Sequence, residues 1–221
     1  MGNQVMAPID LEMAQMVHTH LRDNGVHLIL EDGVSSFEKN GRIIRLKSGK
    51  EVETDMTLLA IGVQPESTIA KDAGLELGVR DAIKVNEHLQ TSDPSIYAVG
   101  DVIEVKDYIN GTDTYVPLAW PANRQGRLVA DHIHGKESVY NGTLGTSIAK
   151  VFELTVASTG SNEKMLKRLG IPYEVVHVAP SSHAGYYPGA SQLHLKLIFD
   201  KETGKIYGAQ AVGKDGVDKR I

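Results

Sequence analysis

The sequence predicts a mixed α/β segment followed by a mostly antiparallel α+β segment. Three features lead to this expectation. Apolar residues recur at helical spacing in residues 10–24, residues 56–61 form a continuous apolar run that suits a strand buried on both faces, and short alternating segments prevail from about Gly145 onward. With 221 residues, the chain is long enough for one large domain or two small ones.

The first element is a helix over residues 10–24. Asp10 is a suitable N-cap and Asn24-Gly25 provides a C-terminal stop. One face of this helix is apolar and consists of Leu11, Ala14, Val17 and Leu21. A short apolar strand is expected next, at residues 26–30.

An antiparallel meander follows. The turn pairs Asn40-Gly41 and Ser48-Gly49 separate alternating segments, which predicts strands near residues 34–38, 42–47 and 50–53. The later elements are a loop with a short helix at 62–78, strands at 83–85 and 96–99, and a helix at 121–135 that has proline in its first turn. The final segment has strands at 148–155, 173–178, 193–199 and 206–211, a helix at 162–169 and a turn at 200–204.

Composition excludes several classes of function. The formal net charge of −5 argues against a nucleic-acid-binding protein, and no apolar run reaches the roughly 20 residues of a membrane-spanning helix. The N-terminus lacks the pattern of a signal peptide, so we expect a cytoplasmic protein. Cysteine is absent, which excludes disulfides, zinc–thiolate sites and thiol chemistry by this chain alone. The histidine pairs, His18/His20 and His132/His134, point to different sides of a helix, so no metal site is expected.

Residues 91–101, T-S-D-P-S-I-Y-A-V-G-D, are the first segment that suggests chemistry. An apolar stretch leads to Gly100 and then to an acid, Asp101. Ligands of open α/β sheets bind outside the carboxyl ends of strands, and a glycine lets a ligand approach the backbone. Asp101 would there accept hydrogen bonds from sugar-alcohol hydroxyl groups. The alternative is an ordinary turn aspartate.

Residues 117–127, P-L-A-W-P-A-N-R-Q-G-R, open the next helix. A helix N-terminus offers free N–H groups and a partial positive charge, which stabilises negative charge by roughly 0.3–2 kcal/mol. Reduced flavin carries such charge around N1 and the C2 carbonyl. The alternative is an ordinary helix that begins near a proline.

Together and in this order, the two segments resemble the pyridine nucleotide–disulfide oxidoreductase family, and within it the coenzyme A-disulfide reductase and NADH oxidase/peroxidase branch. Residues 91–101 match the family form T-x-x-x-x-I-Y-A-x-G-D, and residues 118–126 match L-A-x-x-A-N-R-Q-G. Further matches are A-I-G-V-Q-P at 60–65, K-V-F-E-L at 150–154, S-H-A-G-Y-Y-P-G at 182–189 and A-V-G-K-D-G-V-D-K-R at 211–220. The resemblance covers essentially the whole chain.

The resemblance implies partial Rossmann-like domains that bind FAD and NAD(P)H, together with an α+β dimerisation-type domain, all truncated. We expect the C-terminal part of the NAD(P)H-binding domain at residues 1–66, the later part of the FAD-binding domain at 67–140, and the N-terminal part of the dimerisation domain at 141–221. The chain lacks any G-x-G-x-x-G turn. In the family, such turns and the redox cysteine precede these segments, so the chain is expected to be an interior fragment.

The resemblance also implies roles for individual residues. Asp101 would hold the ribityl chain of FAD, and Leu118, Ala119 and Trp120 would line the flavin, although many relatives have glycine where Trp120 stands. Ile61 and Gly62 would lie near the nicotinamide. On the substrate side, Asn123 matches a position that contacts coenzyme A, and either Tyr186 or Tyr187 would reach the active site of the partner in a homodimer. No arginine precedes Arg22 to receive a 2′-phosphate, which favours NADH over NADPH.

The activity implied for an intact relative is transfer of a hydride from NAD(P)H through FAD to a cysteine-based centre that reduces coenzyme A disulfide or a persulfide. Two alternatives stay open: an NADH oxidase or peroxidase of the same family, and a non-catalytic dimerisation or interaction module. Because the redox cysteine is absent, no catalytic residue is assigned in this chain. We expect the chain alone to be inactive and to bind FAD weakly or not at all.

Overall fold

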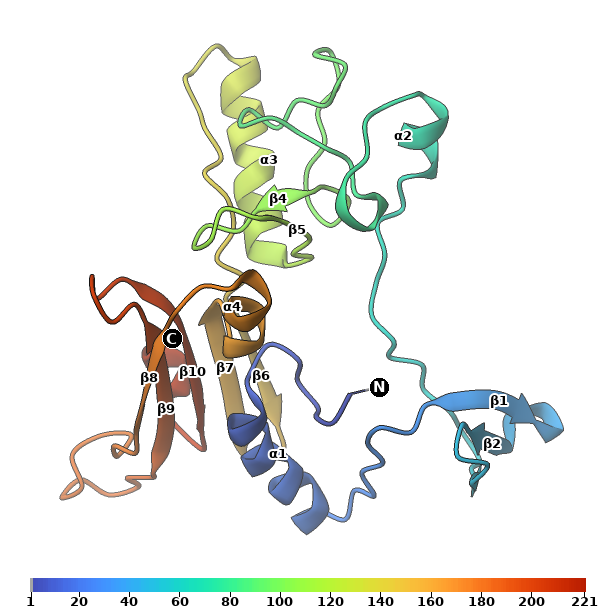
Figure 1. The fold of residues 1–221 in the computed structure, drawn as a ribbon, viewed down its shortest axis with the longest axis vertical. Coiled ribbons are helices and arrows are strands. Elements are labelled where there is room, and N and C mark those ends of the chain that lie inside the picture. Colours follow the sequence, from blue (N-terminus) through green and yellow to red (C-terminus); the bar gives the residue numbers. More distant parts are fainter. Residues whose placement is uncertain (1) are drawn as a thin grey trace. The chain divides into compact units, whose positions relative to one another are not determined.

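The computed structural model describes residues 2–221, which divide into two compact units (Figure 1). The first unit combines the chain up to Ile61 with Ile148–Ser158 and Asn162–Ile221, and the second comprises Gly62–Ser147 and Thr159–Ser161. Within residues 2–221, none of the helices has the length and apolar character needed to cross a membrane.

The first unit begins with the expected helix, α1 (Leu11–Asp23). The expected meander is also confirmed, with strands β1 (Val34–Glu38), β2 (Ile43–Leu46) and β3 (Glu51–Glu53) paired antiparallel in that order. The chain reverses between β1 and β2 at Asn40 and Gly41, with φ angles of 57° and 83°. Asparagine and glycine tolerate this left-handed conformation best, which is why the Asn-Gly pair predicted the turn.

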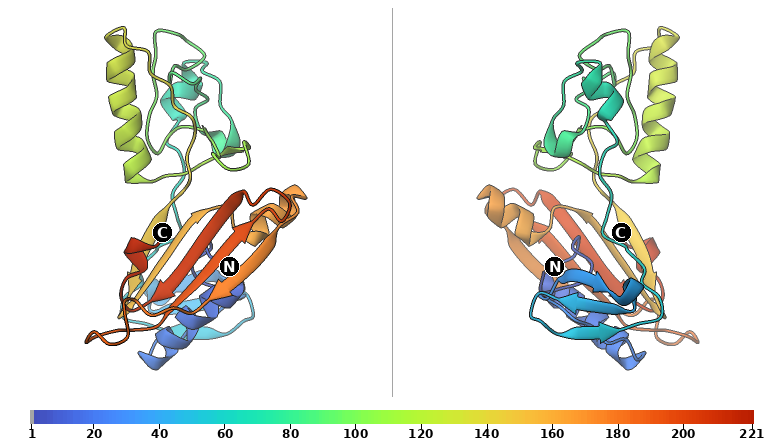
Figure 2. Two further views of the ribbon diagram at one scale, coloured as in Figure 1. Left: turned by 90° about the vertical axis from the view of Figure 1, so that its left-hand side faces the viewer. Right: turned by 90° about the vertical axis from the view of Figure 1, so that its right-hand side faces the viewer.

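The first unit also contains a five-stranded sheet, in the order β6-β7-β10-β9-β8 (Figure 2). Its strands are β6 (Ser147–Val151), β7 (Leu154–Gly160), β8 (Glu174–Val178), β9 (Leu193–Phe199) and β10 (Ile206–Gly213). The ladders of β9 with β10 and of β8 with β9 are antiparallel, as expected. The single strand predicted at residues 148–155 is wrong, because the chain turns at Phe152, whose φ is 51°, and so makes two strands.

Helix α4 (Glu163–Leu169) follows β7 and confirms the helix predicted at residues 162–169. The side chain of Asn162 caps its start by accepting a hydrogen bond of 2.9 Å from the N–H of Met165. Gly170 ends it in the left-handed conformation, with φ 67°. Both signals are local, which explains why the sequence predicted this helix.

Helix α1 packs on the sheet through apolar side chains. Ile9, Met13, Ala14 and Val17 form one buried cluster with Val156 of β7 and Val212 of β10. A second buried cluster joins β7, β9, β10 and the C-terminal residues, and consists of Ala157, Leu193, Ala211 and Val217. The sheet thus gives the N-terminal helix the apolar surface that its pattern requires.

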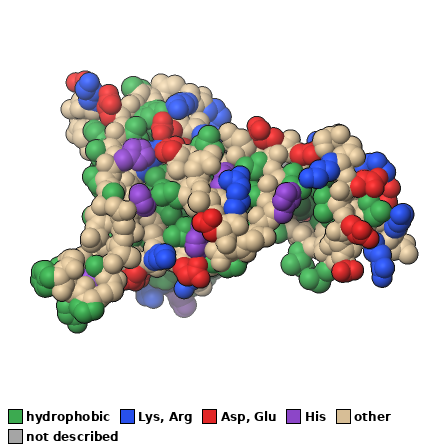
Figure 3. Space-filling view, turned by 90° about the horizontal axis from the view of Figure 1, so that it is seen from below, with side chains coloured by type: hydrophobic (Ala, Val, Ile, Leu, Met, Phe, Trp, Pro, Cys, Tyr) green, Lys and Arg blue, Asp and Glu red, His purple; other side chains and the backbone are tan. Residues whose placement is uncertain are grey.

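The surface shows no segregation of charge on the face drawn in Figure 3, where basic and acidic side chains alternate. The net charge of the whole chain is −5. Such a face offers no basic stripe of the kind that tracks a nucleic-acid backbone.

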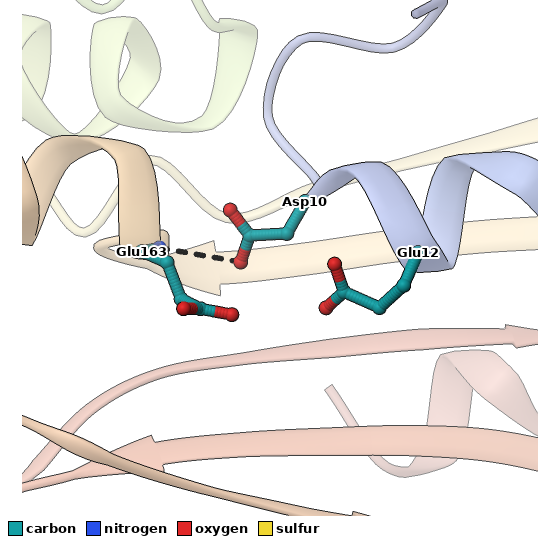
Figure 4. A group of neighbouring side chains, drawn as sticks. All are labelled: Asp10, Glu12 and Glu163. Carbon is teal, nitrogen blue, oxygen red and sulfur yellow. Dashed lines mark hydrogen bonds between the residues drawn. The ribbon is translucent and has the colours of Figure 1, made fainter.

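The N-terminal end of α1 is held by a buried lysine. Asp10 is the N-cap residue, but its side chain makes no capping hydrogen bond, contrary to the prediction. One carboxylate oxygen of Asp10 instead accepts hydrogen bonds from Lys196 on β9 (2.9 Å) and from Gln210 on β10 (2.6 Å). It also accepts one of 3.2 Å from the backbone N–H of Glu163, which Figure 4 shows. Long-range partners have therefore replaced the local cap.

The same lysine neutralises a group of three carboxylates, Asp10, Glu12 and Glu163, whose nearest oxygens lie within 4.8 Å of one another (Figure 4). Lys196 donates hydrogen bonds to all three, and its side chain is fully buried. Such a group of oxygens resembles a cation site, but the ammonium of Lys196 already supplies the positive charge.

The second unit contains α2 (Thr68–Asp72), the short pair β4 (Val105–Lys106) and β5 (Asp113–Thr114), and α3 (Ala119–Ile133). Helix α3 confirms the helix predicted at 121–135, with Pro121 in its first turn. Its apolar side chains Leu128 and Val129 pack on a buried cluster of Leu89, Ile103 and Val105.

Four further predicted strands are wrong. Residues 26–30 and 56–61 belong to no β-ladder, and residues 83–85 and 96–99 contribute only isolated bridges, at Ile83 and Tyr97. The run at 56–61 was expected to be buried on both faces, yet Leu58 is 81% exposed and Ile61 is 88% exposed. A strand needs a hydrogen-bonded neighbour, and none of residues 2–221 pairs with this run.

Candidate functional site

The candidate site lies in the second unit, where the turn at Gly100 and Asp101 meets helix α3. The N–H of Gly100 donates a hydrogen bond of 2.7 Å to the side-chain oxygen of Gln125, which is only 2% exposed. Gly100 has a φ of 79°, and a Cβ atom built there would lie 3.6 Å from that of Ala122. The left-handed backbone therefore requires glycine, and the hydrogen bond to Gln125 fixes the turn against the helix.

Asp101 presents a free carboxylate. Its side chain is exposed, and within residues 2–221 no donor is bonded to its carboxylate oxygens. Its backbone carbonyl accepts a hydrogen bond of 2.8 Å from the hydroxyl of Tyr115. Burial raises the pKa of Tyr115, the negative charge of Asp101 raises it further, and Arg80 opposes this shift. The backbone of Asp101 is thus anchored while its carboxylate stays open to a ligand.

The N-terminus of α3 offers unpaired donors beside this turn. Leu118 is the N-cap residue and provides no side-chain cap. Within the described part of the chain, the N–H groups of Ala119 and Trp120 have no acceptor, and Pro121 has no N–H. These donors and the helix dipole make this end of the helix attractive to a negatively charged group.

A cavity of about 460 Å³ opens at the start of α3. It is lined from α3 by Trp120, Pro121 and Arg124, and from the other side by Tyr108 and residues 140–146. Trp120 is 81% exposed, so most of its ring is available for contact. Aromatic walls beside a cation suit a flat, aromatic ligand that carries negative charge.

These features fit a flavin. The free carboxylate of Asp101 suits the hydroxyl groups of a sugar alcohol, and the uncapped start of α3 suits the electron-rich edge of the ring system. Leu118, Ala119 and Trp120, which the sequence proposed for this role, lie at that start of α3, the helix that anchors the Asp101 turn. The structure thus places three of the four residues proposed for FAD at the start of α3 and holds the fourth, Asp101, in a turn that is bonded to this helix through Gly100. Of the four, only Trp120 lines the cavity.

Asn123 lies one turn further along α3 and is exposed. Its side-chain amide donates a hydrogen bond of 3.0 Å to the carbonyl of Ala119, so one of its donors is used within the helix. The amide oxygen remains available for a ligand.

The remaining proposed residues are not part of this cluster. Gly62, with a φ of 92°, begins the second unit, and Ile61 is the last residue of the N-terminal segment of the first. Tyr186 and Tyr187 lie in the segment between β8 and β9 of the first unit and are 93% and 68% exposed. The ring of Tyr187 contacts His183 edge to face, with centroids 5.7 Å apart, which leaves Tyr186 the freer of the two.

Three residues that support the site were not predicted from the sequence, namely Gln125, Tyr115 and Arg80. The position of Gln125 could have been predicted from the helical spacing. It lies three residues after Ala122 and four before Val129, so it is a polar residue on the inner face of α3. A polar residue on an inner helix face needs a hydrogen-bond partner. Tyr115 and Arg80 gave no such signal, because their contacts depend on the fold.

Comparison with protein families gives two matches. The model described as pyridine nucleotide-disulphide oxidoreductase matches residues 1–126. The model of the pyridine nucleotide-disulphide oxidoreductase dimerisation domain matches residues 146–221.

Among curated proteins, the chain is 36% identical to the coenzyme A disulfide reductase of Staphylococcus epidermidis over 214 residues, which cover 96% of this chain and 48% of that protein. The chain therefore spans about half the length of the curated relatives it matches.

Two solved structures are closely similar. Reduced CoADR-RHD of Bacillus anthracis has a TM-score of 0.98 and 66% sequence identity, and the match covers 100% of this chain and 40% of that chain. The NAD-dependent persulfide reductase from A. fulgidus has a TM-score of 0.95 and 38% identity, with coverage of 100% and 42%.

Proposed function

The chain belongs to the pyridine nucleotide-disulphide oxidoreductase family, and from this premise we propose that it contributes the later part of an FAD site to an NAD(P)H-dependent reductase of coenzyme A disulfide or a persulfide. One observation carries the proposal. The hydrogen bond between Gly100 and Gln125 fixes the Asp101 turn against α3, the helix whose N-terminus has no side-chain cap.

Each residue of this site has a distinct task. The carboxylate of Asp101 would accept hydrogen bonds from hydroxyl groups of FAD, and the N–H groups of Ala119 and Trp120 would stabilise negative charge on the flavin. Leu118 and the ring of Trp120 would line the flavin and exclude water. When bound, the flavin would supply two-electron transfer between a nicotinamide and a thiol–disulfide centre.

The nicotinamide side is proposed at Ile61 and Gly62. Gly62 holds a φ of 92° and has no atom within 4 Å of the place where a Cβ would stand, so a ligand can approach its backbone closely. We favour NADH over NADPH, because residues 1–21 offer no arginine to pair with a 2′-phosphate.

The substrate side is proposed at Asn123, Tyr186 and Tyr187. The exposure of the tyrosines and the match of residues 146–221 to a dimerisation domain support contact with a partner subunit in a homodimer. The chain contains no cysteine, so its own residues supply no thiol.

We propose a cytoplasmic location, and a three-part division into nicotinamide, FAD and dimerisation segments at residues 1–66, 67–140 and 141–221.

Equilibrium dialysis of FAD against the 221-residue chain tests the proposal. We expect weak but saturable binding, reduced by Asp101→Asn and unchanged by Asp93→Asn, a substitution of an exposed aspartate in the same segment. The chain alone should not reduce coenzyme A disulfide with NADH, because it has no thiol. Equal binding by both variants would remove Asp101 from the site.

A further inference from the structure

Arg80 connects two segments of the second unit, the one that begins at Gly62 and the one that contains Tyr115. Its guanidinium donates a hydrogen bond of 3.2 Å to the backbone carbonyl of Val63, the residue after Gly62. The same guanidinium lies 5.3 Å from the centre of the Tyr115 ring. The hydroxyl of Tyr115 in turn donates to the carbonyl of Asp101 at 2.8 Å. A continuous series of contacts therefore joins Val63 to Asp101.

We propose that Arg80 and Tyr115 are positioning residues, which hold the Gly62–Val63 segment at a fixed spacing from the Asp101 turn. This inference rests on the proposed function, in which the first segment serves the nicotinamide and the second the flavin. A hydride donor and its acceptor must be held in a narrow range of distance and angle. A bridge between the two backbones would set that range without touching either cofactor.

The backbone at Arg80 supports a specific role. Arg80 has a φ of 56° and Asp81 a φ of 61°, which are unfavourable for residues with long or branched side chains. The turn at Val79–Asp81 is held in place by the carboxylate of Glu104, which accepts a hydrogen bond of 2.7 Å from the N–H of Val79. Such strain persists where the surroundings dictate the conformation, and here it aims the guanidinium at Val63 and Tyr115.

The positive charge of Arg80 acts on the same residues that its side chain contacts. Arg80 forms no ion pair with any carboxylate in residues 2–221, so its charge is directed at a carbonyl and an aromatic face. Arg80 lowers the pKa of Tyr115 whereas burial and Asp101 raise it. The pKa of Tyr115 therefore responds to both Arg80 and Asp101.

Nuclear magnetic resonance of the full chain tests the bridge without any cofactor. In Arg80→Gln, we expect shifts of the amide signals of Gln64 and Val102, which follow the Val63 and Asp101 carbonyls. The pKa of Tyr115 should rise in Arg80→Gln and fall in Asp101→Asn. Lys84→Gln, which removes an exposed charge from a neighbouring segment, is the matched control and should leave both readouts unchanged.

A second variant separates positioning from stability. Arg80→Gly relieves the backbone strain, so it should fold at least as stably as the parent chain, yet it should shift Val102 as Arg80→Gln does. Shifts confined to Gln64 in both variants, or equal shifts in Lys84→Gln, would overturn the inference.

FAD affinity by dialysis supplies the functional readout. Tyr115→Phe and Arg80→Gly should weaken binding on the order of tenfold, the effect of losing one positioning hydrogen bond. If the parent chain binds no FAD, the proposed FAD site fails for this chain, whereas the amide shifts still decide whether the bridge exists. Unchanged affinity in both variants would count against a positioning role.

Discussion

The ammonium nitrogen of Lys196 lies 2.9 Å from a carboxylate oxygen of Asp10, a residue 186 positions earlier in the chain. Lys196 stands on β9 and Asp10 at the start of α1. The same lysine donates to Glu163 at 2.5 Å, and Gln210 of β10 donates to Asp10. This one buried cation thus ties α1 and α4 to the central strands of the sheet.

Lys196→Met should destabilise the first unit strongly. The substitution keeps much of the buried volume but leaves the carboxylates of Asp10 and Glu163 without their cation, and breaking a buried ion pair costs about 3–5 kcal/mol. Denaturant unfolding would measure the loss. Lys201→Met is the matched control, because Lys201 is an exposed lysine of the turn after β9 that pairs with Glu174 at 3.7 Å, and its substitution should change stability little. Similar stability of the two variants would refute the stabilising role of Lys196.

Acid should weaken the same cluster in a defined pH window. Burial alone raises the pKa of Glu163, but hydrogen bonds from Lys196 and Tyr173 lower it from its ordinary 4.5 to about 2. A carboxyl with a depressed folded-state pKa stabilises the fold above pH 4.5, and this stability is lost as the pH falls toward 2. The slope reaches roughly 1.4 kcal/mol per pH unit for one proton. In Glu163→Gln the free energy of unfolding should depend less on pH across this window, and an unchanged slope would contradict the assignment.

Gln125→Leu should release the Asp101 turn from α3. The N–H of Gly100 would lose its acceptor and remain partly buried, at a cost of about 1–3 kcal/mol. FAD binding should fall in parallel, because the Asp101 turn is no longer fixed to α3. Gln64→Leu, at an exposed position of the same unit, is the control for the change of side chain. FAD binding that survives Gln125→Leu intact would show that this hydrogen bond does not organise the site.

Two glycine substitutions should have opposite effects. Gly100→Ala forces a side chain onto a φ of 79°, which costs roughly 1–2 kcal/mol and displaces Asp101. Gly126→Ala, in the middle of α3 with no atom within 4 Å of the new Cβ, should stabilise the helix by roughly 0.5–1 kcal/mol. Thermal unfolding of both variants checks the pair. The same sign of effect in both variants would be inconsistent with a left-handed backbone at Gly100 and a helical one at Gly126.

The elements that the sequence predicted correctly carry their signals within a few residues. Asn162 and Gly170 bound α4, and Asn40-Gly41 makes the turn of the meander, because caps and turns depend on local backbone geometry. The candidate site residues Asp101 and Trp120 were found because each belongs to a short motif of fixed spacing.

The errors concern properties that depend on distant residues. Residues 56–61 have the composition of a buried strand, but burial requires partner strands that the composition cannot supply. Asp10 has the side chain of an N-cap, but Lys196 and Gln210 compete for its carboxylate from far along the chain. The Arg80–Tyr115 contact could not be predicted for the same reason, since only folding brings the two segments together.

The central claim, that the start of α3 beside Asp101 is a flavin site, is tested most directly by Trp120. It is the only tryptophan of the chain and it lines the cavity, so its fluorescence reports on that place alone. Titration with FAD, corrected for absorption, should quench the fluorescence to a plateau, and Asp101→Asn should shift the midpoint to higher FAD concentration. Quenching that never saturates, or that is identical in Asp101→Asn, would contradict the claim.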